Sequence, residues 1–105
     1  MVLALASVVP TARAGAPLPA GGHFTAGAGT IGAAANGLTI NQTSAHGIID
    51  WQSFSIGAGY VVQIDNGAGA TLNRVTGSDL SSIAGMLRGT GSVYLVNPNG
   101  LIIMP

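Results

Sequence analysis

The side chains that could carry acid–base or metal chemistry are few and widely spaced in this chain. Its 105 residues include three arginines and three aspartates, but no glutamate, lysine or cysteine. Hydrolysis of a glycosidic bond needs two carboxyl groups held close together, whereas Asp50, Asp65 and Asp79 lie in separate segments. The two histidines, His23 and His46, stand alone and lack the spacing of metal ligands. We therefore expect no enzyme active site, no metal site and no bound cofactor.

The balance of charge excludes two further classes of function. Arg13, Arg74 and Arg88 are matched by the aspartates, so the formal net charge is zero. Nucleic acids and anionic membranes attract a basic stripe or patch, which three separated arginines cannot form. Asp50 and Arg74 lie in corresponding segments and could pair, as a solvated ion pair with little effect on stability. We expect no nucleic-acid partner.

The clearest local signal is a tight turn, Asn97-Pro98-Asn99-Gly100, followed by an apolar run at residues 101–103. Proline presets φ for the second turn position, the first asparagine can cap the turn through its side chain, and glycine tolerates a positive φ. Asn97→Asp keeps side-chain size and turn propensity, so it should leave the fold nearly intact. The sequence leaves two alternatives for Asn97: it only builds the turn, or it also contacts a partner.

Short strands are expected for most of the chain. From Leu38 onward, apolar and polar residues alternate with period two, and glycine-rich turns interrupt the pattern. Glycine is abundant at 17 residues and aromatic residues make up only 5%, a composition that suits stacked strands better than helices. Asn66-Gly67 has the sequence of a two-residue antiparallel hairpin. Residues 78–87 fit either one helical turn or a strand.

Several blocks of the sequence together resemble one known family. They are Ile-Asp-Trp-Gln-Ser-Phe at 49–54, Leu-Asn-Arg-Val-Thr-Gly at 72–77 and Asn-Pro-Asn-Gly at 97–100, with strand-like runs at 37–42 and 91–96. In this order and spacing they resemble the two-partner-secretion domain at the N-terminus of filamentous-haemagglutinin-type exoproteins. The resemblance extends from about Leu38 to Ile103.

The resemblance implies both a fold and a function. The fold is all-β, a right-handed parallel β-helix of about four coils with a few extra antiparallel strands and an N-terminal cap. The function is to target a large bacterial exoprotein for secretion and to nucleate its folding. The partner is an outer-membrane β-barrel transporter with periplasmic recognition domains, and the product is secreted or held at the cell surface. Regions downstream of this domain would contact a host-cell surface or glycan. The alternative function for the chain is that of a β-helix carbohydrate-active enzyme or a glycan-binding module.

The same resemblance assigns the candidate residues. Transporter recognition falls on the turn formed by Asn97, Pro98, Asn99 and Gly100. The structural core is expected to contain the larger apolar residues of the strands: Trp51, Phe54, Ile56, Leu72, Val93 and Leu95. Trp51, the sole tryptophan, either fills the interior or binds carbohydrate from the surface, and its strand context favours the interior.

The chain divides into three stretches. Residues 1–14 combine a short apolar run with a small-residue cleavage pattern, which indicates the remnant of a signal peptide that starts upstream of Met1. Residues 15–37 are rich in Gly, Ala and Pro and are expected to form an irregular leader, with His23 and Phe24 tucked in as a cap. Residues 38–105 form the secretion domain, which we expect to be truncated because an uncapped apolar strand ends it.

Overall fold

The computed structural model describes residues 17–104, and within this range the chain forms strands and turns without an α-helix. The signal-peptide remnant expected in residues 1–14 lies outside the described residues. The strands, in chain order, are β1 (His23–Ala26), β2 (Gly29–Ala34), β3 (Gly37–Gln42), β4 (His46–Trp51), β5 (Val61–Asp65), β6 (Ala70–Val75), β7 (Ser81–Ile83), β8 (Met86–Gly89), β9 (Ser92–Val96) and β10 (Leu101–Ile103). The all-β prediction is confirmed. The described part of the chain contains no helix with the length and apolar character needed to cross a membrane.

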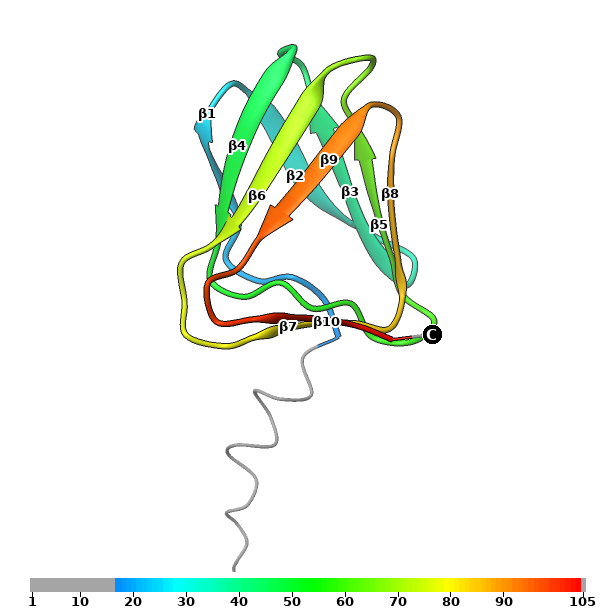
Figure 1. Cartoon of the computed structure of the whole chain (residues 1–105). Helices are drawn as coiled ribbons and strands as arrows, with labels where there is room; N and C mark the ends of the chain where they lie inside the picture. Colours follow the sequence, from blue (N-terminus) through cyan, green and yellow to red (C-terminus); the bar gives the residue numbers. More distant parts are fainter. Residues whose placement is uncertain (1–16, 105) are drawn as a thin grey trace, which may run out of the picture.

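The strands form three sheets around one interior (Figure 1). The first, here called the β4 sheet, has the order β1-β4-β6-β9, and the second, the β3 sheet, has the order β2-β3-β5-β8. The third, the β7 sheet, pairs β7 with β10. In Figure 1 the two larger sheets lean toward each other above a base formed by β7 and β10. From β3 onward the chain alternates between the β3 sheet and the β4 sheet, and the second and third coils also add β7 and β10 to the β7 sheet. In the first coil an isolated bridge between Ile56 and Ile83 takes that place.

Successive passages through the sheets stack in parallel register. Gly37 pairs with Val61, and Val61 pairs with Met86. The strands β4, β6 and β9 pair in the same parallel manner. Three such coils lie in residues 37–104, and an antiparallel first layer brings each larger sheet to four strands. The described residues thus contain three parallel coils and one antiparallel layer, compared with the expected four or so coils with a few extra antiparallel strands.

Residues of the leader form that first layer. β1 runs antiparallel to β4 with Phe24 opposite Ile49, and β2 runs antiparallel to β3 with Ile31 opposite Ile40. Phe24 and Ile31 also pack against the buried core. The irregular backbone expected for residues 15–37 is therefore wrong for both strands. Pairing with a neighbouring strand orders a segment whose own glycine-rich composition carries little strand propensity.

Two turns differ from their sequence-based expectations. Asn66-Gly67 does not close an antiparallel hairpin, because β5 before it belongs to the β3 sheet and β6 after it to the β4 sheet. The hairpin lies instead between β2 and β3, around Ala35 and Asn36, where Asn36 has a φ of 55°. Residues 78–87 contain β7 and the start of β8, so the strand alternative is confirmed there and the helical turn is wrong.

Apolar side chains from all three sides of the coil form the core. The buried members are Ile40, Ile49, Trp51, Phe54, Ile56, Val62, Ile64, Val75 and Ile83. Val93 and Leu95 are half-buried and pack against this cluster. The rings of Trp51 and Phe54 meet edge to face, with centroids 5.3 Å apart. Removing such surface from water stabilises the fold by about 25 cal/mol per Å².

Leu72 is an exception to the expected core, because it lies on the outer face of the β4 sheet. Along β6 the buried side chains are Thr71, Asn73 and Val75, and Leu72 between them is only half-buried. Since side chains alternate across a strand, Leu72 cannot share the inner face with these residues. The apolar character of Leu72 predicts the wrong face because the inward positions on either side of it in β6 are taken by hydrogen-bonded polar residues, Thr71 and Asn73.

Candidate functional site

The Asn97–Gly100 turn follows β9 at the corner between the β4 and β7 sheets. The Gly100 N–H donates to the Asn97 carbonyl oxygen at 3.1 Å, and the Asn99 N–H donates to Asn97 Oδ1 at 2.9 Å. Gly100 has a φ of 119°, in the region that favours glycine. This geometry agrees with the roles expected for the turn residues.

Two asparagine side chains clamp this turn onto the preceding coil. Asn97 Nδ2 donates to the Asp79 carbonyl oxygen at 3.0 Å and to Ser81 Oγ at 2.9 Å. Asn99 Nδ2 donates to the Gly77 carbonyl oxygen at 2.8 Å and to Asn97 Oδ1 at 2.9 Å. We call these contacts the asparagine clamp. Both amide groups therefore use their donors within the domain.

The clamp limits what the folded turn offers to a partner. Pro98, Asn99 and Gly100 are exposed, whereas Asn97 is half-buried. A partner of the folded domain would therefore meet the proline ring and peptide groups more readily than the Asn97 amide. Sequence reasoning missed the other side of the clamp, the loop between β6 and β7. A serine at a buried position of β7, Ser81, is the signal that could have revealed it, since buried hydroxyl groups need partners.

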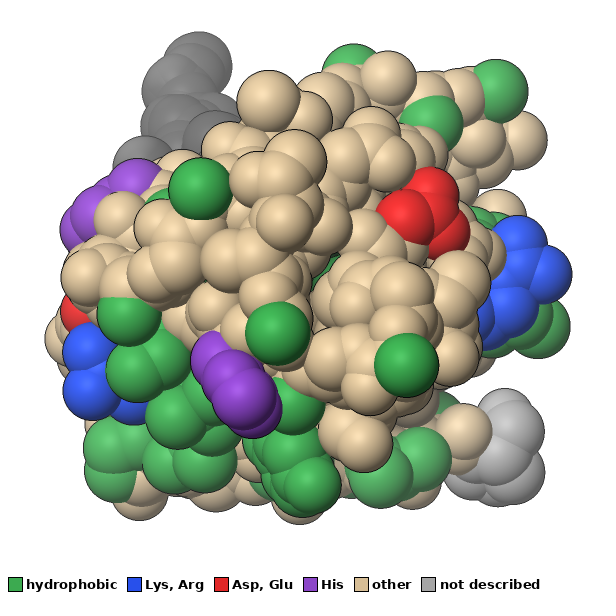
Figure 2. All heavy atoms as spheres, turned by 90° about the horizontal axis from the view of Figure 1, so that it is seen from above, with side chains coloured by type: hydrophobic (Ala, Val, Ile, Leu, Met, Phe, Trp, Pro, Cys, Tyr) green, Lys and Arg blue, Asp and Glu red, His purple; other side chains and the backbone are tan. Residues whose placement is uncertain are grey.

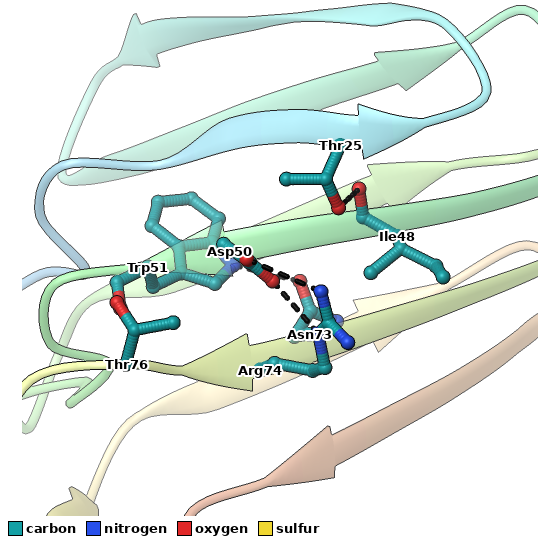
Figure 3. A network of polar contacts seen from close by, with 7 residues as sticks. All are labelled: Thr25, Ile48, Asp50, Trp51, Asn73, Arg74 and Thr76. Atoms are coloured by element: carbon teal, nitrogen blue, oxygen red, sulfur yellow. Dashed lines mark hydrogen bonds and ion pairs between the residues drawn. The ribbon is translucent and has the colours of Figure 1, made fainter.

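Asp50 and Arg74 form a two-point ion pair on the outer face of the β4 sheet (Figure 3). Arg74 Nε donates to Asp50 Oδ1 at 2.8 Å, and Nη2 donates to Oδ2 at 3.2 Å. The hydrogen bond and the charge of Asp50 raise the pKa of Arg74 above its ordinary value, so the guanidinium stays charged. The pairing expected from the sequence is confirmed. The Arg74 side chain is 45% exposed, and water screens the pair.

Trp51 points into the interior on the same strand (Figure 3). Its indole Nε1 donates to Asn73 Oδ1 at 3.0 Å, and Asn73 Nδ2 donates to the Tyr94 carbonyl oxygen at 3.1 Å. The Thr76 hydroxyl also donates to the Trp51 carbonyl oxygen, at 3.1 Å. Trp51 is 1% exposed, so its ring cannot stack on a carbohydrate at the surface of the folded domain.

A second buried polar chain lines the corner between the β3 and β4 sheets. Thr71 Oγ1 donates to Gln42 Oε1, and Asn66 Nδ2 donates to Thr71 Oγ1 at 2.9 Å and to the Ser92 carbonyl oxygen at 3.0 Å. Asn66 Oδ1 accepts the Gly91 N–H at 2.7 Å. These bonds connect all three coils, and no buried side-chain nitrogen or oxygen in residues 17–104 lacks a partner. Polar residues at inward positions of alternating strands are the sequence signal that was missed.

The structure keeps the acidic side chains on separate elements. Asp50 lies in β4, Asp65 in β5 of a different sheet, and Asp79 in the loop after β6. Over the described range, no group of three or more acidic or histidine residues could hold a metal ion. In Figure 2 the acidic side chains in view likewise lie on opposite sides of the face. An open hollow of about 380 Å³ lies between residues 42–45 and 66–69, and none of its lining residues carries a carboxylate.

The described residues form a coil of parallel strands that ends in a turn clamped by two asparagines. Residues 16–105 match the family model described as the TPS secretion domain, so the chain belongs to this family of two-partner-secretion domains. It is a secretion-targeting domain of an exoprotein, as the resemblance implied. The carbohydrate-directed alternative is not favoured.

Similar proteins of known name agree with this membership. The chain is 40% identical, over 82% of its length, to a heme/hemopexin-binding protein of Haemophilus influenzae strain Rd, and 45% identical, over 66% of its length, to a second such protein of that species. It spans only 10% and 8% of these two relatives. The crystal structure of the HMW1 secretion domain from Haemophilus influenzae matches with a TM-score of 0.75 and 32% identity, over 82% of this chain and 23% of that one.

Proposed function

We propose that this domain delivers a longer exoprotein to a dedicated outer-membrane β-barrel transporter with periplasmic recognition domains. The exoprotein is then secreted or held at the surface of a Gram-negative bacterium. Membership of the two-partner-secretion family supports this assignment. The activity of the rest of the exoprotein lies outside the shared region, since this chain matches only about a tenth of its heme/hemopexin-binding relatives.

We also propose that the domain is the first part of a right-handed parallel β-helix and nucleates its folding outside the cell. The parallel register of the three coils supports this inference. The last coil presents unpaired backbone N–H and C=O groups along its edge strands, next to an apolar interior, and the next coil can be added by pairing with them. Stepwise addition buries apolar surface outside the membrane, and the free energy released opposes return of the chain through the transporter.

The asparagine clamp is the observation that carries the proposed order of events. In the folded domain the Asn97 and Asn99 amides donate to the Asp79, Ser81 and Gly77 atoms of the preceding coil. A transporter that accepts hydrogen bonds from these amide N–H groups must therefore bind them before the coil closes. Recognition of the turn and folding of the domain would then exclude each other, and release from the transporter would be coupled to folding.

Binding to isolated periplasmic domains of the cognate transporter tests this order. We expect the folded 105-residue chain to bind weakly, and the Trp51→Ala variant, which loses the buried ring of the core, to bind more strongly under the same conditions. Adding Asn97→Ala and Asn99→Ala to the Trp51→Ala chain should then weaken binding. Tighter binding by the folded chain than by the Trp51→Ala chain would contradict the proposal.

A further inference from the structure

Three Asn-Gly pairs occur in the chain: Asn36-Gly37, Asn66-Gly67 and Asn99-Gly100. An asparagine in such a pair can lose its side-chain amide group spontaneously, a reaction called deamidation. The glycine backbone nitrogen attacks Cγ of the asparagine, a C–N bond forms, and ammonia leaves to give a succinimide. Water then opens the ring to aspartate or isoaspartate. Glycine favours this step because it has no side chain to obstruct the attack and restricts the backbone least.

The fold restrains two of these three asparagines. Asn66 is 4% exposed, its Nδ2 donates to Thr71 Oγ1 and the Ser92 carbonyl oxygen, and its Oδ1 accepts bonds from the next coil. Asn99 Nδ2 is held by the Gly77 carbonyl oxygen at 2.8 Å and by Asn97 Oδ1 at 2.9 Å. Rotating either amide into position for attack breaks these bonds, so reaction requires local opening.

Asn36 lacks this restraint. It is exposed in the hairpin between β2 and β3, with a φ of 55°. Within residues 17–104 its side chain has no hydrogen-bond partner, and its carbonyl oxygen accepts the Val61 N–H. We propose that Asn36 is the site of spontaneous deamidation in the folded domain, and that folding protects Asn66 and Asn99 from the same reaction.

Modification at Asn36 would alter the first layer of the stack. Aspartate adds a negative charge to a chain whose formal net charge is zero. Isoaspartate also inserts a backbone methylene into the tight loop that joins β2 to β3. Because the Ala34–Gly37 pair closes this hairpin, the longer loop would weaken pairing at that end of β2.

Ageing the full 105-residue chain at neutral pH and mapping its peptides by mass spectrometry tests the proposal. Circular dichroism first establishes that the sample is folded, and a parallel sample is aged in concentrated urea. In the folded sample we expect Asn36 to convert at least roughly tenfold faster than Asn66 or Asn99, since each of these must first break its amide hydrogen bonds. In urea the three sites should convert at similar rates.

Two variants make the test specific. Asn36→Gly, which suits the positive φ, should remove the early mass change while leaving the circular dichroism spectrum unchanged. Asn97→Ala removes one acceptor of the Asn99 amide, so it should accelerate conversion at Asn99 and leave the rate at Asn36 unchanged. Conversion at Asn66 or Asn99 as fast as at Asn36 in the folded chain would overturn the proposal. So would equal protection of all three sites.

Discussion

The Trp51 indole N–H donates to Asn73 Oδ1 at 3.0 Å inside the coil, and the two residues belong to adjacent strands of one sheet. Asn73 Nδ2 continues the connection to the Tyr94 carbonyl oxygen in the following strand, at 3.1 Å. A single buried amide therefore joins three coils through both its acceptor and its donor. This contact gives Asn73 a structural role that its polar character would not suggest.

Replacing Asn73 should destabilise the domain despite the small size of the side chain. Asn73→Ala leaves the indole N–H and the Tyr94 carbonyl oxygen without their partner in the interior, at a cost of about 1–3 kcal/mol. Trp51→Ala should cost about 3–5 kcal/mol, because it empties the largest buried side-chain volume. Urea unfolding followed by far-UV circular dichroism measures both changes.

Tyr94→Phe provides the matched control. Tyr94 is 56% exposed, and its hydrogen bond from Asn73 Nδ2 is made by the backbone carbonyl oxygen, which Tyr94→Phe keeps. The free energy of unfolding should therefore change by less than about 0.5 kcal/mol. An Asn73→Ala variant with the same unfolding midpoint as Tyr94→Phe would show that the buried amide does not stabilise the coil.

Asn97→Asp changes the asparagine clamp. The sequence alone predicts a nearly intact fold, but the carboxylate removes both donors from Asn97 and faces the Asp79 carbonyl oxygen. We now expect a loss of about 1–3 kcal/mol in the free energy of unfolding. Pro98→Ala, at an exposed position, should cost at most about 1 kcal/mol. Thermal melts should show a lower midpoint for Asn97→Asp than for Pro98→Ala. Equal midpoints would show that the asparagine clamp does not stabilise the domain.

A matched pair of glycine substitutions isolates backbone strain at the turn. Gly100 has a φ of 119°, and a Cβ there would approach Leu80 no closer than 3.9 Å, so its replacement tests conformation rather than space. Gly100→Ala should cost about 1–3 kcal/mol. A Cβ at Gly32 meets no atom within 4 Å and needs no positive φ, so Gly32→Ala should be neutral or slightly stabilising. Chemical denaturation should give a lower unfolding midpoint for Gly100→Ala than for Gly32→Ala. Equal midpoints would show that the turn relaxes without cost.

Leu72 and Ile49 test which face of the β4 sheet is inside. Ile49 is fully buried, so Ile49→Ala should cost about 2–5 kcal/mol. Leu72 is half-buried on the outer face, and Leu72→Ala should cost less than about 1.5 kcal/mol. Unfolding midpoints in urea give the comparison. A greater loss for Leu72→Ala would reverse the assignment of the two faces.

Local patterns were sufficient to predict most strands after Leu38, the turn at Asn97 and the family resemblance. Contacts between coils were harder to predict because they join residues far apart in sequence. The sequence predicts Leu72 in the interior because no local signal shows that Asn73 has a buried partner. The sequence predicts an irregular leader because its strands depend on pairing with β3 and β4. Asn66-Gly67 also fits a hairpin because a corner between sheets uses the same turn residues.

Transporter-dependent secretion of a reporter is the most direct test of the domain's function. The 105-residue chain, placed behind a complete signal peptide and fused to a reporter, is expressed with and without the cognate outer-membrane transporter. We expect reporter in the medium only when the transporter is present, and periplasmic retention when it is absent. A transporter lacking its periplasmic domains should also leave the reporter in the periplasm. Equal release with and without the intact transporter would contradict the assignment of this chain as a secretion-targeting domain.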